Sequence, residues 1–108
     1  MNPLTRTPEE RETATAAGAA AADVPGVAYL SPRLTDRLRS RTAPGVTVRW
    51  RTDPAQCAVT VSLAVRTGYQ AARVAQHVRE AVVEAVYATY PQTLTTPVTV
   101  SVTVTAIV

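Results

Sequence analysis

Three stretches of the chain alternate apolar and polar residues with period two, and this repeated alternation limits the possible folds most strongly. Valine and tryptophan alternate with threonine and arginine over residues 46–51, and valine and leucine alternate with threonine and serine over residues 59–66. The Asp53-Pro54 turn separates these two runs, so they predict a hairpin with one buried face. Residues 98–105 alternate in the same way and predict a third strand.

Between the second and third of these stretches, from about Gln70 to Tyr90, the apolar residues take helical spacing. One face of this helix, within about 100° on a helical wheel, is formed by Ala71, Val74, Val78, Ala81, Val82, Ala85 and Thr89. We expect this face to lie on the sheet. A shorter helix is predicted from Ser31 to about Arg41, because Ser31 is a good N-cap and Pro32 suits the first helical position.

The predicted order is therefore helix, strand, strand, helix, strand. It indicates a two-layer α+β domain with a three-stranded sheet, one face of which is covered by the long helix. The third strand is expected either parallel beside the second or antiparallel beside the first. We assign this domain to residues 24–108. Residues 1–23 hold no large apolar residue after Leu4, and we predict that they form a disordered or weakly helical Ala-rich tail.

The composition removes most catalytic chemistry. All 11 basic residues are arginine, so chemistry that depends on a Schiff-base or phosphate-binding lysine is excluded. The one histidine, His77, is predicted on the outward side of the long helix and the one cysteine, Cys57, in the core, which argues against a nucleophile and base pair. A single histidine and a single cysteine also argue against a zinc site. We expect no enzyme, no catalytic residue, no cofactor and no metal.

The same cysteine count indicates the compartment. One thiol allows no disulfide within the chain, which favours a reducing cytoplasm. The first residues carry glutamates ahead of a short alanine run and do not resemble a secretory signal. No run of about 18 strongly apolar residues is present that would span a bilayer.

An arginine-rich face is one candidate binding surface. The outward positions of the predicted strands carry threonine, serine and arginine but no carboxylate, and the formal net charge of +3 permits an anionic partner. The candidate anion-binding residues are Arg33, Arg37, Arg41, Arg49, Arg51 and Arg66. The alternative is that threonine and arginine are simply suitable solvent-facing strand residues. Trp50 is predicted on the core side, which argues against an RNA-binding sheet with stacking aromatics.

A protein-binding surface near the end of the chain is the other candidate. No charged side chain occurs from Ala85 to Val108. If the last strand lies at an edge, it lacks the charges that usually block pairing with another strand. Strand addition or homo-oligomerisation is then expected. The alternative is that the strand is central and already paired on both sides. The outward valine and tyrosines of the long helix contact either the 31–41 helix or a partner. The candidate partner surface comprises Val83, Tyr87, Tyr90, Val102 and Val104.

Four segments, in this order, are VPGVAYLSPRLTDRLRSR, GVTVRW, VTVSLAVRTGYQAARVAQHVREAVVEAVYATY and VTVSVTV. Together they resemble the alkaline-shock-protein family, also called the envelope stress response family, of Gram-positive bacteria and actinobacteria. The resemblance covers about residues 24–108, and its most specific pieces are the Val24-Pro25-Gly26-Val27 step and Gly68 followed by the long helix. Members commonly have a Thr-Gly-Leu step after this helix, where the chain has Tyr90-Pro91-Gln92-Thr93-Leu94.

The resemblance implies a non-enzymatic protein of cell-envelope homeostasis that acts as an interaction or scaffold module. It implies a position near the inner face of the cell membrane through an integral membrane partner. We expect the protein to associate with itself or with sibling proteins. It transfers no catalytic residues. Arginine without lysine also fits an actinobacterial, GC-rich coding bias. The alternative function is binding to nucleic acid or another anionic surface through the arginine-rich face.

Overall fold

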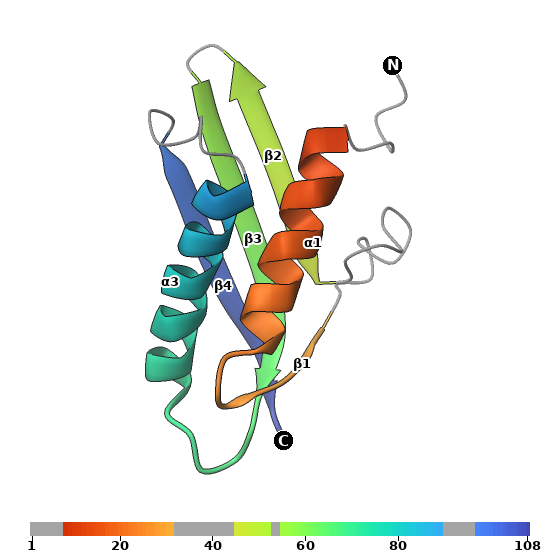
Figure 1. Cartoon of the computed structure of the whole chain (residues 1–108). Helices are drawn as coiled ribbons and strands as arrows, with labels where there is room; N and C mark the ends of the chain where they lie inside the picture. The colour runs from red at the N-terminus through yellow and green to blue at the C-terminus, as the bar shows by residue number, and fades with distance from the viewer. Residues whose placement is uncertain (1–7, 32–44, 53–54, 90–96) are drawn as a thin grey trace.

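The computed structural model describes residues 8–31, 45–52, 55–89 and 97–108. Its elements are helix α1 (Pro8–Ala22), strands β1 (Val27–Leu30), β2 (Val46–Thr52) and β3 (Ala55–Val65), helix α3 (Ala71–Thr89) and strand β4 (Val98–Ile107) (Figure 1). The α+β class is confirmed. The predicted element order is wrong, because α1 and β1 precede β2. The helix predicted after Ser31 lies outside the described residues.

Strand β3 is the centre of the sheet. Strand β4 pairs with it in parallel, from Cys57↔Val98 to Val65↔Ile107, which confirms one of the two predicted placements of the last strand. Strands β2 and β1 pair with β3 in antiparallel orientation, one after the other on its opposite side. At their junction the Ser62 N–H donates to the Gly45 carbonyl at 2.8 Å. The described sheet thus has four strands, where the sequence predicted three, because β1 continues the line of β2.

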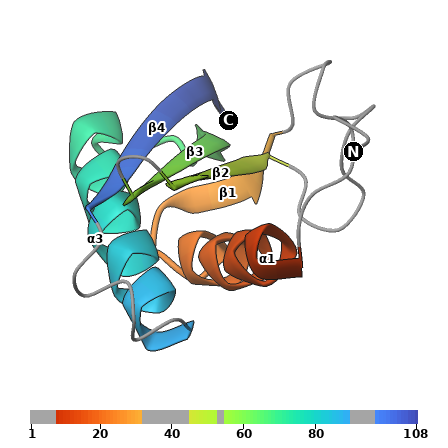
Figure 2. The same ribbon diagram turned by 90° about the horizontal axis from the view of Figure 1, so that it is seen from above.

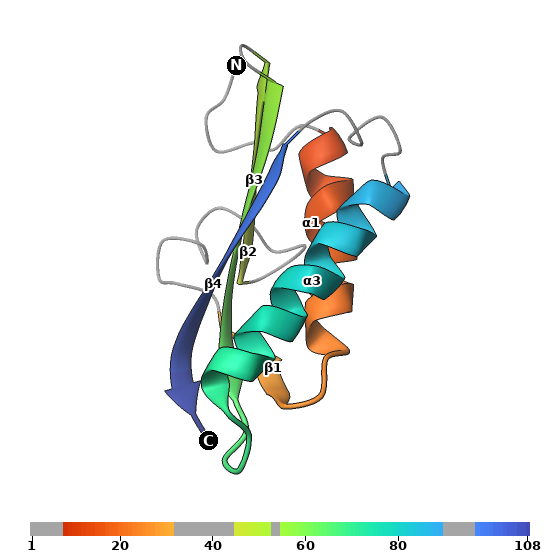
Figure 3. The same cartoon turned by 90° about the vertical axis from the view of Figure 1, so that its left-hand side faces the viewer.

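The alternation in β3 places its large apolar side chains on one face. Cys57, Val59, Val61, Leu63 and Val65 are at most 1% exposed. Figures 2 and 3 show both helices on this face of the sheet. The predicted cover by the long helix alone is therefore corrected to a cover by α1 and α3. Helix α3 contributes buried residues at four-residue spacing, Val74, Val78, Val82 and Val86.

Helix α1 lies where the sequence predicted a disordered or weakly helical tail. Its residues Ala14, Ala17 and Ala21 are 0% exposed and recur at the spacing of one helix face. The helix contacts α3, β1 and β2. Alanine has the highest helix propensity, and its short side chain lets a helix approach its neighbours closely. The tail prediction is thus corrected over residues 8–22, which form part of the folded core without any large apolar side chain.

Candidate interaction surface along strand β4 and helix α3

Strand β4 forms an edge of the described sheet. It pairs with β3 on one side, and no described strand pairs with its other side. The Cys57 N–H donates to the Pro97 carbonyl at 3.0 Å. In a parallel pair, alternate residues of a strand bond to the same neighbour, so Thr99, Ser101 and Thr103 continue this pattern toward β3. The outward backbone groups then belong to the residues between them, Val98, Val100, Val102 and Val104.

The side chains of these four valines face the helix layer. Val100 is buried, whereas the other three are half-buried and pack against the core. The predicted partner residues Val102 and Val104 therefore lie on the open edge of the sheet. Because β4 carries neither a charge nor a proline, nothing in its sequence blocks pairing with a further strand.

The predicted partner residues of α3 lie on the flank beside β4. On the opposite flank, Val74 faces the turn between α1 and β1, since a Cβ built on Gly26 would lie 2.7 Å from Val74 Cγ2. Val83 follows Val74 by nine residues, about two and a half helical turns, and so occupies the other flank. Tyr87 follows one turn later, and both are half-buried. Helix α3 contacts β4, and in Figure 1 it lies on the side of the sheet away from β2.

Val83, Val102 and Val104 all pack against the same core, and Tyr87 follows Val83 by one turn of α3. We call this set, together with the outward backbone of residues 98–104, the β4 edge surface. The fifth predicted residue, Tyr90, lies outside the described residues. So do residues 32–41 of the predicted 31–41 helix, which was one of the two alternatives for what covers this face.

The described arginines of the candidate anion-binding patch do not gather in one place. Arg49 and Arg66 are exposed. Arg49 pairs with Ala58, whereas Arg66 follows the far end of β3. The strand from Ala58 to Arg66 spans about 26 Å at about 3.3 Å per residue. For Arg51 only the backbone position in β2 is described. The other three candidate arginines, Arg33, Arg37 and Arg41, lie outside the described residues.

Four exposed apolar side chains were not predicted from the sequence. They are 49–61% exposed: Tyr29, Tyr69, Ile107 and Val108. Three of them lie near the end of β3, on either side of it: Tyr29 pairs with Ala64, whereas Ile107 pairs with Val65 and the Val108 N–H donates to the Val65 carbonyl at 2.9 Å. The aromatic residue within the VAYL segment was the available signal, but no strand was predicted there.

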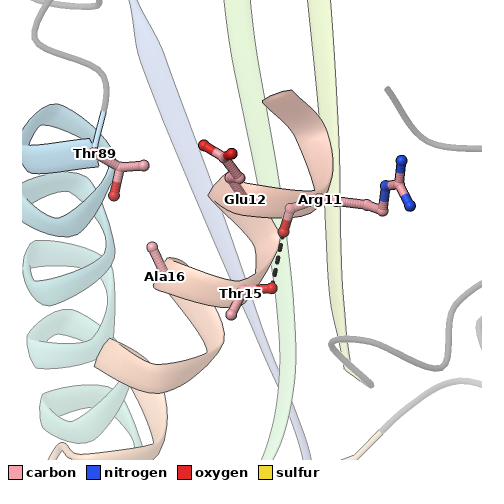
Figure 4. Close-up of a pocket in the computed structure, with 5 residues that line it drawn as sticks. All are labelled: Arg11, Glu12, Thr15, Ala16 and Thr89. Carbon is pink, nitrogen blue, oxygen red and sulfur yellow. Dashed lines mark hydrogen bonds between the residues drawn. The ribbon is translucent and has the colours of Figure 1, made fainter. Parts of the chain in front are cut away.

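A groove lies between α1 and the C-terminal end of α3 (Figure 4), and its lining residues are Arg11, Glu12, Thr15, Ala16 and Thr89. Both threonine hydroxyls donate to carbonyls of their own helices, Thr15 Oγ1 to Arg11 at 2.9 Å and Thr89 Oγ1 to Ala85 at 2.8 Å. In Figure 4 the Arg11 side chain extends away from Thr89. These lining residues therefore present no converging nucleophile and base.

The single cysteine and the single histidine differ in their exposure to solvent. Cys57 is buried, and His77 is exposed on α3, as predicted. Among the residues that the structure describes, no group of three or more His, Cys, Asp and Glu side chains could hold a metal ion. In the same part of the chain, no helix combines the length and the apolar character needed to cross a membrane.

Comparison with known proteins does not identify a family. No family model matches the chain, and neither the curated proteins nor the solved structures include a match.

Proposed function

We propose that this protein is a non-enzymatic interaction or scaffold module of the envelope stress response. It associates with itself, and a partner protein holds it at the inner face of the cell membrane. The resemblance of the segments over residues 24–108 supports the cellular role. The observation that carries the molecular role is the uncharged open edge of β4, whose outward backbone groups and half-buried valines are arranged to receive another polypeptide.

The β4 edge surface offers two kinds of contact. The backbone groups of residues 98–104 can add a strand, a mode in which main-chain hydrogen bonds supply affinity. The flank of α3 adds Val83 and Tyr87, and tyrosine is enriched at the energetically important positions of interfaces. We assign self-association to the strand edge and the membrane-linked partner to the helix flank.

Replacing Val102 by lysine should weaken self-association by about tenfold or more, equivalent to about 1.4 kcal/mol. The substitution places a charge on the apolar side of the edge strand, where it must be desolvated when a second strand arrives. Light scattering coupled to size exclusion measures the change. Ala58→Lys is the matched control, because Ala58 is exposed on the central strand β3, which is already paired on both sides. Equal masses for Val102→Lys and the wild type would contradict the assignment.

Replacing Tyr87 by aspartate should abolish capture of the membrane-linked partner. A tagged full-length chain is incubated with detergent-solubilised membranes of the organism that encodes it, and captured proteins are identified by mass spectrometry. The expected result is a transmembrane protein bound by the wild type and lost with Tyr87→Asp. Ala88→Asp adds the same charge one residue later, at an exposed position about 100° around the helix, and should keep the partner. Identical captures by both variants would remove the helix flank from the proposal.

The alternative function, binding to nucleic acid or another anionic surface, has less support. Phosphate binding gains strength from several arginines that act together. The exposed Arg49 and Arg66 are instead separated by most of the length of β3. Between them on β3, Thr60 is half-buried and Ser62 and Ala64 are buried, and none of these side chains carries a charge.

A further inference from the structure

The regular part of the edge strand reads the same in both directions. Residues 98–104 are Val-Thr-Val-Ser-Val-Thr-Val, with Ser101 at the centre. We propose that β4 pairs in antiparallel orientation with β4 of a second copy of this chain, about a twofold axis at Ser101. A twofold axis places two identical strands antiparallel. Because residues 98–104 read the same in both directions, each of them then faces a residue of its own type. This inference rests on the proposed self-association and names its partner and register.

The outward backbone groups fit this register. Val98 faces Val104 of the second copy, and Val100 faces Val102. These are the four residues whose N–H and C=O groups point away from β3. Each outward group therefore finds a partner, which gives about eight hydrogen bonds across the axis. Thr99, Ser101 and Thr103 alternate with them at non-hydrogen-bonded positions, where facing side chains lie closest.

The two ends of the regular stretch select the same centre independently of the palindrome. Leu63 pairs with Val104 but Ala64 pairs with Ala106, so Thr105 is an extra residue and the alternation stops after Val104. At the other end, strand β4 begins at Val98. In the proposed register Pro97 faces Thr105 of the second copy at a non-hydrogen-bonded position, where no donor is required. The residues available for regular pairing are thus 98–104, centred on Ser101.

The layers of the two copies also match. A twofold axis perpendicular to the sheet keeps the helices of both copies on the same face, so the two α3 helices become neighbours. The half-buried side chains of Val83 and Val102 then lie at the junction, where the second copy removes further apolar surface from water. The absence of charge on β4 leaves no like-charge repulsion between the strands. The opposite edge strand, β2, contains Arg49 and Arg51, which disfavour the same self-pairing.

Cysteine substitution tests the axis directly. Ser101 is exposed and would face its own copy across a non-hydrogen-bonded pair, with Cα atoms about 4.5 Å apart. That separation lies within the range of disulfides. Under mild oxidation, most of the full-length Ser101→Cys chain should run as a covalent dimer on a non-reducing gel. The wild-type chain should stay monomeric on that gel, because its Cys57 is buried.

Two further variants test the register. Thr99→Cys and Thr103→Cys should each fail to cross-link alone, because equal positions are about 13 Å apart along the paired strands, at about 3.3 Å per residue. An equimolar mixture of the two should cross-link, because residue 99 of one copy faces residue 103 of the other. This pattern, with Ser101→Cys positive, supports the proposal.

Two outcomes overturn it. If the wild type has a dimer mass in light scattering but Ser101→Cys does not cross-link, the register is wrong, and the proposed scaffold function stands with another self-contact. If the wild type remains a monomer at the highest soluble concentration, β4 does not pair with itself. Capture of the membrane partner then decides separately whether the proposed function survives.

Discussion

Replacing Ala17 by glutamate is expected to remove several kcal/mol from the free energy of unfolding. Ala17 is 0% exposed in the part of α1 that packs on the core, so the new side chain either buries a carboxyl group or displaces the helix. A small domain commonly has only about 5–15 kcal/mol of stability in total. Urea unfolding followed by circular dichroism measures the loss.

Ala19→Glu is the matched control for this prediction. Ala19 belongs to the same helix and is exposed, so the same substitution should change the stability by no more than about 0.5 kcal/mol. If residues 8–22 were a tail, both variants would be as stable as the wild type. Equal stability would therefore contradict the packing of α1 and support the tail that the sequence predicted.

The elements that the sequence predicted correctly are those with large apolar residues at a clear period. Strands β2, β3 and β4 alternate valine, tryptophan or leucine with polar residues, and α3 repeats valine every four residues. Helix α1 has no such signal, because its core face consists of alanines. A prediction that depends on large apolar side chains therefore misses a helix whose alanines let it pack closely on its neighbours.

Strand β1 was missed for a different reason. It has four residues between Gly26 and Ser31, too few for an alternation to be recognised. Its formation depends on residues distant in the chain: Leu30 pairs with Leu63, and the Arg66 N–H donates to the Gly26 carbonyl at 2.8 Å. Such pairing is a property of the assembled sheet and is not visible in the local pattern.

The candidate site was predictable in composition but not in position. The sequence showed that the last strand carries no charge, and left open whether it is central or at an edge. Only the order of strands places β4 at the edge of the described sheet. Likewise, the sequence places Val74 and Val83 on opposite sides of α3. Only the contact between the Gly26 turn and Val74 shows which of these sides is covered. Periodicity defines faces of an element, whereas neighbours decide which face stays open.

Replacing Gly26 by alanine is expected to lower the free energy of unfolding by about 2–5 kcal/mol, the sum of a backbone cost and a packing cost. Gly26 has φ of 96°, a left-handed conformation that costs an L-residue about 1–2 kcal/mol. A Cβ there would also lie 2.7 Å from Val74 Cγ2 and 2.8 Å from Tyr69 Cδ1. Gly68→Ala is the matched control, since Gly68 has φ of 99° but nothing within 4 Å of the added carbon.

The difference between the two alanine variants isolates the packing cost, because their backbone costs are nearly equal. Tyr69 is 49% exposed and its ring can move into solvent, but Val74 is 3% exposed on the buried face of α3. Relief of the clash at Val74 therefore requires a shift of α3 relative to the turn between α1 and β1. Urea unfolding should show a clearly larger loss for Gly26→Ala than for Gly68→Ala. Equal losses would mean that α3 yields at no cost, and that this contact does not fix the position of α3.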